Sequence, residues 1–313
     1  MANNLALVFP GQGSQYVGMG KALSGDFAAA KNTFAEADDA LDFPLSQLCF
    51  AGPEEDLKLT ENTQPAILAT SVAGFRVLQA ETPLRPMLVA GHSLGEYSAL
   101  VAAGAIEFRE AVRIVRERGR LMQQAVPNGE GAMAVVLGLD MDATLALCAE
   151  ASGDEIVAPA NFNGGGQIVI AGTKRAVKRA MVLARKRGAK RVLDLPVSAP
   201  FHCPLMKPAA EGLEALLRDV PVQSLKIGVV TNVEAEVNWS ADRVKALLVE
   251  QAIRPVRWEQ SVRKLDELGV RQIIEVGPGK VLKNLIKRIE PAMTVENFEM
   301  SEDLAKVLAV MQS

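Results

Sequence analysis

The stretch Met87-Leu88-Val89-Ala90-Gly91-His92-Ser93-Leu94-Gly95 sets the fold expected for this chain. Residues 87–90 form a short apolar run typical of a buried strand, and residues 94–103 have the composition of a helix that ends at Gly104. Between them lies the pattern Gly-x-Ser-x-Gly, which in this setting predicts a tight strand-to-helix turn with an exposed serine. The two glycines remove side chains that would collide around such a turn. We therefore predict an α/β fold with a strained serine above the carboxyl ends of the strands.

Apolar strands and helical segments alternate on both sides of this turn. Outside residues 129–197, strands are expected at 5–9, 226–230 and 272–276, and helices near 27–41, 65–80 (after a Thr63 cap), 107–125, 205–218, 241–252, 258–268 and from 280. Inside that range, the strands expected at 132–137, 156–161, 167–171 and 191–195 and the helices at 143–151 and 174–186 follow the ferredoxin-like order β-α-β-β-α-β. We predict a hydrolase-like parallel-sheet core formed by residues 1–128 and 198–313, with residues 129–197 as an inserted ferredoxin-like subdomain.

Composition limits the possible functions. The chain has 313 residues, of which 49% are hydrophobic and 23% charged, as in ordinary globular proteins. A net charge of −3 supplies no basic footprint for nucleic acid, and no apolar run reaches the roughly 18 residues that span a bilayer. The three cysteines, Cys49, Cys148 and Cys203, are far apart and form no disulfide or zinc pattern. The first residues do not resemble a signal peptide. We expect a cytoplasmic monomer that binds no nucleic acid, membrane or metal.

Ser93 needs a base, because a free serine hydroxyl is a weak nucleophile. The chain has only two histidines, His92 and His202. His92 is adjacent to Ser93 on a sharp turn, so we expect its side chain to point away from the serine. His202, in the loop after the last strand of the insertion, is then the predicted base. Since the sequence places no carboxylate as the third member, a backbone carbonyl is an alternative means of orienting the histidine. A serine and histidine in this setting predict acyl transfer through a serine ester.

Other loops supply supporting groups. The amide of Leu94, directly after the serine, is expected to form one half of an oxyanion hole, and the loop Gly11-Gln12-Gly13 either supplies the other half or is a plain turn. The segment 164–166 predicts a hairpin turn, and Cys203 is expected to be a packed small residue. The basic segment 185–191 is either a solvated helix end or a patch for a partner.

Five separated motifs together resemble the malonyl-CoA:acyl carrier protein transacylase family. They span nearly the whole chain and are Phe9-Pro10-Gly11-Gln12-Gly13-Ser14-Gln15, Gly91-His92-Ser93-Leu94-Gly95-Glu96, Ala160-Asn161-Phe162-Asn163, Phe201-His202 and Glu275-Val276-Gly277-Pro278-Gly279. The family's fold is a hydrolase-like core with a ferredoxin-like insertion, as predicted from the pattern. The resemblance implies malonyl transfer from a coenzyme A thioester to the phosphopantetheine thiol of acyl carrier protein, for fatty acid synthesis, with no resident cofactor.

The resemblance also implies roles for individual residues. Ser93 is implied as nucleophile and His202 as base, with the amides of Gln12 and Leu94 as the oxyanion hole. Arg118 is implied as the clamp on the malonyl carboxylate, a role that suits a planar guanidinium. Two further residues are implied as substrate-binding, namely Gln251, near the histidine, and Phe201, where some members of the family carry a serine.

Other functions fit the same core. A serine esterase or thioesterase would pass the acyl group to water instead of a carrier. A transferase of the same class could carry acetyl or methylmalonyl, and a carrier-binding protein without activity could retain the fold. The acyl-serine and its products distinguish these functions.

Overall fold

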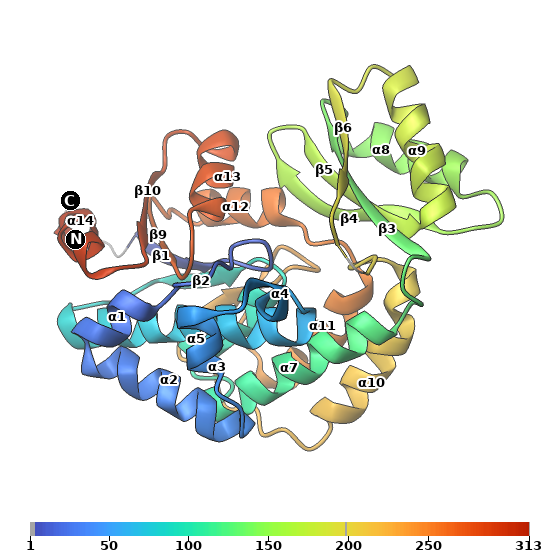
Figure 1. Ribbon diagram of the computed structural model, residues 1–313. Helices are drawn as coiled ribbons and strands as arrows, with labels where there is room; N and C mark the ends of the chain where they lie inside the picture. Colours follow the sequence, from blue (N-terminus) through green and yellow to red (C-terminus); the bar gives the residue numbers. More distant parts are fainter. Residues whose placement is uncertain (1–3, 198, 313) are drawn as a thin grey trace.

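The computed structural model describes residues 4–197 and 199–312, which form a large α/β core and a smaller four-stranded unit at one side (Figure 1). The predicted domain ranges also include residues 1–3, 198 and 313, which lie outside the described residues. Within the described part of the chain, no helix is both long and apolar enough to cross a bilayer.

The core is built on one six-stranded sheet with the order β10-β9-β1-β2-β7-β8. The pairs β10–β9, β9–β1, β1–β2 and β2–β7 are parallel, whereas β8 runs antiparallel to β7 at the edge. The strands are β1 (Leu5–Phe9), β2 (Leu88–Gly91), β7 (Gly228–Val230), β8 (Val237–Asn238), β9 (Gln272–Val276) and β10 (Thr294–Phe298). Because β1 and β2 are central and adjacent, the loops that follow them meet at the same edge of the sheet.

Helices cover both faces of this sheet (Figure 1). In β1, Leu5, Leu7 and Phe9 pack into one apolar cluster, while Ala6 and Val8 pack into another, since alternate side chains of a strand face opposite ways. The first cluster is completed by α1 (Lys21–Asp26), α2 (Ala28–Leu41), α3 (Leu45–Ala51), α4 (Glu54–Leu57), α5 (Thr60–Glu81), α6 (Leu94–Ala102), α7 (Phe108–Gln124), α10 (Lys207–Leu217), α11 (Ala241–Ile253) and α14 (Leu304–Gln312). The second is completed by α12 (Trp258–Glu267) and α13 (Val281–Ile289).

The smaller unit is an antiparallel sheet with the order β4-β5-β3-β6. Its elements are β3 (Gly131–Leu137), α8 (Met141–Ser152), β4 (Val157–Gly164), β5 (Gln167–Thr173), α9 (Lys174–Lys186) and β6 (Arg191–Leu195). The order β-α-β-β-α-β is the one predicted, and the glycine segment 164–166 forms the expected hairpin turn between β4 and β5. The predicted fold class is confirmed.

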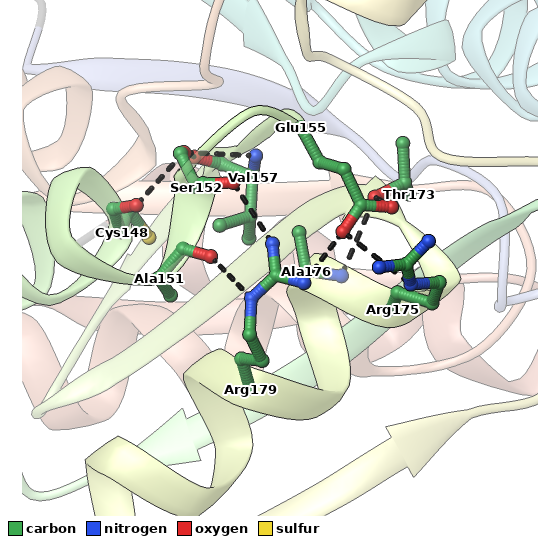
Figure 2. Close-up of polar contacts among 9 residues, drawn as sticks. All are labelled: Cys148, Ala151, Ser152, Glu155, Val157, Thr173, Arg175, Ala176 and Arg179. Carbon is green, nitrogen blue, oxygen red and sulfur yellow. Dashed lines mark hydrogen bonds and ion pairs between the residues drawn. The ribbon is translucent and has the colours of Figure 1, made fainter.

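Arg179 fastens the two helices of this unit to each other (Figure 2). From α9 it donates to the carbonyls of Ala151 and Ser152, at 2.9 and 2.8 Å, and to Glu155 Oε2 at 2.5 Å. The last carbonyls of a helix have no partner within the helix, so a guanidinium at this position satisfies two of them at the end of α8. These polar contacts join the two helices of the subdomain, in addition to the apolar core that the subdomain has of its own.

Two expectations differ from the structure. The helix α5 begins at Thr60, five residues before Pro65, and not after a Thr63 cap. Thr63 Oγ1 donates instead to the Leu57 carbonyl at 2.5 Å, and burial of nearly the whole helix outweighs the backbone hydrogen bond that Pro65 removes. Strand β10 was not expected; its alternation of exposed and buried residues over Thr294–Phe298 is short and includes the polar Glu296 and Asn297.

Candidate active site

Ser93 stands at the tip of the turn between β2 and α6. Its backbone has φ 51° and ψ −108°, a conformation that non-glycine residues rarely adopt and that costs about 1–3 kcal/mol. A Cβ atom on Gly91 would lie 1.9 Å from the carbonyl carbon of Gly95, and one on Gly95 would lie 2.0 Å from the carbonyl oxygen of Phe9. The turn therefore closes only with glycine at both positions, as predicted, and it holds the serine side chain out of the sheet.

Ser93 and His202 form a hydrogen-bonded pair. The Ser93 Oγ lies 2.7 Å from His202 Nε2, and His202 Nδ1 lies 2.8 Å from the backbone carbonyl oxygen of Gln251. A carbonyl oxygen only accepts hydrogen bonds, so Nδ1 carries the proton and Nε2 is left to accept from the serine. Of the two ways to orient the histidine, the structure has the backbone carbonyl.

The surroundings keep His202 neutral. Burial, together with the nearby Arg118 guanidinium, lowers the pKa of His202 to about 3. A neutral imidazole at physiological pH is able to take a proton from Ser93. The geometry and the protonation state together suit a serine nucleophile with its base.

His92 turns away from this pair, as predicted. Its Nε2 lies 3.0 Å from Asn163 Oδ1 of β4, and its ring centroid lies 5.6 Å from that of Trp258. Burial lowers the pKa of His92 as well. His92 thus joins the turn to the inserted subdomain instead of contacting the serine hydroxyl.

Arg118 of α7 reaches the serine from the other side. Its Nη1 donates to Gln64 Oε1 at 2.7 Å, and its Nη2 donates to Gln251 Oε1 at 2.9 Å and to Ser93 Oγ at 3.3 Å. These partners are all neutral oxygens, although Arg118 is only 1% exposed. A buried guanidinium with neutral partners attracts an anion, and the place where a carboxylate would neutralise it is beside the serine.

A cavity of about 490 Å³ opens at this point, between the core and the subdomain. Its walls come from both units and consist of Gln12, Gly13, Gln15, Lys58, Gln64, His92, Ser93, Arg118, Met122, Met133, Asn161, Leu195, Pro196, Val197, Phe201 and His202. Phe201 is thus part of the wall. Gln251 is fully buried and contacts Arg118 and His202 from behind, so its position suits support of those residues more than contact with substrate.

The two residues predicted to form an oxyanion hole lie near Ser93. Leu94 is the first residue of α6, so its amide has no acceptor within the helix. Gln12 follows β1 and lines the cavity. A Cβ atom on Gly11 would lie 2.4 Å from the His92 carbonyl oxygen, so a glycine at this position lets the loop approach the turn. The roles of the two amides stay predictions.

Comparison with known proteins identifies the family. Residues 6–302 match the acyl transferase domain family. The chain belongs to this family. It is 48% identical over 304 residues to the malonyl CoA-acyl carrier protein transacylase of Escherichia coli K12, covering 97% of this chain and 98% of that one. The predicted resemblance is confirmed.

Solved structures resemble this acyl transferase equally closely. An acyl carrier protein S-malonyltransferase from Vibrio cholerae O1 superimposes with a TM-score of 0.96 at 48% identity, covering 97% of this chain and 100% of that one. A malonyl transacylase in complex with the holo acyl carrier protein of a type II polyketide synthase gives a TM-score of 0.96 at 47% identity, covering 98% and 99%. The predicted fold, a hydrolase-like core with a ferredoxin-like insertion, is confirmed by this agreement.

Sequence reasoning missed several residues of the acyl transferase site. Asn232 Oδ1 accepts from the Ser93 amide at 2.7 Å, and its Nδ2 donates to the Gly91 carbonyl at 2.6 Å. Gln64, which holds Arg118, was not singled out either, and Asn163, which holds His92, was quoted in a family motif without a role. One feature of the sequence could have indicated Asn232. It is a polar residue just after β7, and because β7 is the parallel neighbour of β2, such a residue lies at the same sheet edge as the serine.

Two further residue groups of the acyl transferase were singled out from the sequence. Cys203 is fully buried, its Sγ donates to the Pro200 carbonyl at 3.1 Å, and burial raises its pKa to about 12, so it is a packed residue as expected. The basic segment 185–191 lies at the far end of the subdomain. Strand β6 pairs Leu195 with Met133 beside the cavity and Arg191 with Leu137, about 13 Å farther along.

Proposed function

We propose that this protein transfers the malonyl group from malonyl-CoA to the phosphopantetheine thiol of acyl carrier protein, through a malonyl ester on Ser93. The observation that carries the proposal is the convergence of a neutral Ser93–His202 pair and the buried Arg118 guanidinium on one cavity. The close relatives named as malonyl transacylases, one of them solved with its carrier protein, support the acyl group and the acceptor.

The first half-reaction forms the ester. Ser93 Oγ attacks the thioester carbonyl while His202 Nε2 takes the Oγ proton, and the amides of Gln12 and Leu94 stabilise the negative oxygen of the tetrahedral intermediate. The carbon–sulfur bond then breaks, and His202 returns the proton to the departing coenzyme A sulfur. The carrier thiol repeats these steps in reverse, so atoms and protons balance without a cofactor.

Arg118 selects the acyl group in this proposal. Malonyl differs from acetyl by a carboxylate one methylene from the thioester carbonyl, and the Nη2 of Arg118 lies 3.3 Å from the attacking oxygen. A carboxylate held by the guanidinium places the carbonyl carbon near Ser93 Oγ. Acetyl has no carboxylate to hydrogen-bond the guanidinium, and this lowers its transition-state stabilisation.

We further propose that the protein acts in the cytoplasm as a monomer, in fatty acid synthesis. The carrier protein is acidic, and the basic segment 185–191 is the predicted docking patch. In this segment Arg187 pairs with Glu150, whereas Lys186 and Lys190 are exposed. Charge reversal of both lysines is expected to slow transfer to the carrier without slowing ester formation. An unchanged rate of transfer to the carrier would remove the docking proposal.

Intact-mass spectrometry tests the proposed reaction. The protein is mixed in turn with malonyl-CoA, acetyl-CoA and methylmalonyl-CoA, and then with carrier protein bearing its phosphopantetheine arm. A malonyl adduct that is absent in Ser93→Ala and moves to the carrier supports the proposal. Free malonate without a carrier adduct indicates a thioesterase, and no adduct with any thioester contradicts the proposal.

A further inference from the structure

Ser93 and Glu96 have the spacing of a helix-capping box, but neither residue caps the helix. In a capping box the serine oxygen accepts from an amide of the first turn, and the glutamate reaches back to the serine amide. Ser93 makes no side-chain cap, since its hydroxyl is turned to His202, and its amide donates to Asn232 Oδ1 at 2.7 Å. Neither capping contact is therefore made, and the Glu96 carboxylate is available for another contact.

Glu96 uses a single oxygen to hold two other residues. Its Oε2 accepts from Gln251 Nε2 at 2.7 Å and from the Asn232 backbone amide at 3.1 Å. Glu96 is 2% exposed, and burial raises its pKa to about 7. A protonated Glu96 still has one oxygen that only accepts, so both contacts survive in either protonation state.

These two residues carry the contacts of the catalytic groups. Gln251 holds Arg118 through Oε1 and His202 through its carbonyl oxygen, and Asn232 holds the amide of Ser93. The Glu96 oxygen is the closest of the acceptors that turn Gln251 Nε2 inward, at 2.7 Å against 3.1 Å for the Ser93 carbonyl oxygen, and Oε1 is then left for Arg118. Arg118 favours the same orientation of the Gln251 amide group, because a guanidinium only donates and therefore requires the oxygen, Oε1, to face it.

We propose that Glu96 is a positioning residue for malonyl recognition, which acts through Gln251 and Asn232 by means of one correctly placed acceptor oxygen. The inference rests on the proposed function, because it concerns how Arg118 and Ser93 are held for a malonyl group. The charge of Glu96 also acts on Arg118 through space, but in this proposal the position of the acceptor oxygen has the larger effect on malonyl recognition.

Two nearly isosteric substitutions separate position from charge. Glu96→Gln keeps an acceptor oxygen at the same reach and removes the charge, so KM for malonyl-CoA and the malonyl-to-acetyl preference are expected to stay within about twofold of wild type. Glu96→Asp keeps the charge and withdraws the oxygen by one methylene. It is expected to raise KM for malonyl-CoA about tenfold and to reduce the malonyl-to-acetyl preference by about the same factor, with a smaller effect on kcat.

The measurement is the rate of acyl-serine formation with malonyl-CoA and acetyl-CoA, with circular dichroism as a check of folding. Glu96→Asp with a wild-type malonyl-to-acetyl preference overturns the proposal, because a loss of stability alone lowers both rates equally. Glu96→Gln as impaired as Glu96→Asp overturns it too, since charge would then be the cause. A wild-type protein that forms no malonyl-serine contradicts the proposed function itself, whatever the variants do.

Discussion

Two glycine turns of this molecule, the elbow at Gly91–Gly95 and the hairpin at 164–166, use glycine for different reasons. In the hairpin the glycines themselves adopt positive φ, at 83°, 60° and 73°, as a tight reversal between strands requires. In the elbow the glycines provide space, and the positive φ of 51° falls on Ser93. The positive φ thus falls on glycine, which adopts it without strain, where the turn is structural, and on the reactive residue, which is strained by it, where the turn presents a nucleophile.

The two histidines give the sharpest test of this comparison. His202→Ala removes the base beside Ser93 and is expected to slow malonyl-serine formation about 10³-fold or more. His92→Ala, the matched control, removes a contact to Asn163 of the subdomain and is expected to slow the same step less than tenfold. Rapid-quench kinetics with malonyl-CoA measures both. Equal losses in the two variants would mean that the elbow does not separate the two histidines as the geometry indicates.

Alanine at a glycine of each turn tests why glycine is present. In Gly95→Ala the new Cβ would meet the Phe9 carbonyl oxygen at 2.0 Å, so we expect a loss of about 3 kcal/mol or more in the free energy of unfolding. In Gly166→Ala the nearest atom is 3.5 Å away, and only the φ of 73° opposes the change, at about 1 kcal/mol. Urea denaturation gives both values. A Gly95→Ala protein as stable as Gly166→Ala would show that the elbow relaxes.

Arg118→Lys tests the charge that faces the elbow. Lysine keeps the charge but lacks the planar fork that reaches Gln64, Gln251 and the serine together. We expect kcat/KM for malonyl-CoA to fall about 30-fold, and the value for acetyl-CoA to change less. A similar fall in kcat/KM for both thioesters would show that Arg118 does not select the acyl group.

The pH profile is expected to show the smallest change. The pKa of His202 is lowered from 6.5 to about 3, so the imidazole remains an acceptor as pH falls through the usual histidine range. The rate of malonyl-serine formation should change less than about twofold between pH 8 and pH 5.5. The unfolded chain, in which His202 has its ordinary pKa, binds a proton below about pH 6.5 that the folded chain does not bind, so the contribution of His202 to stability falls as pH drops from 6.5 towards 3. A rate that halves at pH 6.5 would contradict the burial argument.

Local sequence was sufficient for the elements with strong periodicity and for the reactive pair. The strand, turn and helix around Ser93 lie within a few residues of one another, and the small number of histidines left His202 as base. The insertion was predicted equally well, because β3 and β5 contain continuous apolar runs and turn residues bound the shorter apolar stretches of β4 and β6. Strands β8 and β10 and the helices α1, α3, α4 and α14 were missed, since brief elements take their stability from packing against neighbours and not from their own pattern.

The sequence by itself determined that a serine would sit on a strained strand-to-helix turn, and motif resemblance added Arg118 and the acyl group. Only the tertiary structure decided what holds these groups. Asn232 and Gln251 lie 139 and 158 positions from Ser93 in the chain, yet both hydrogen-bond to its backbone. Such contacts follow from the parallel order of β1, β2 and β7 and from the packing of α11, and side-chain amides give no periodic signal from which their partners are predicted.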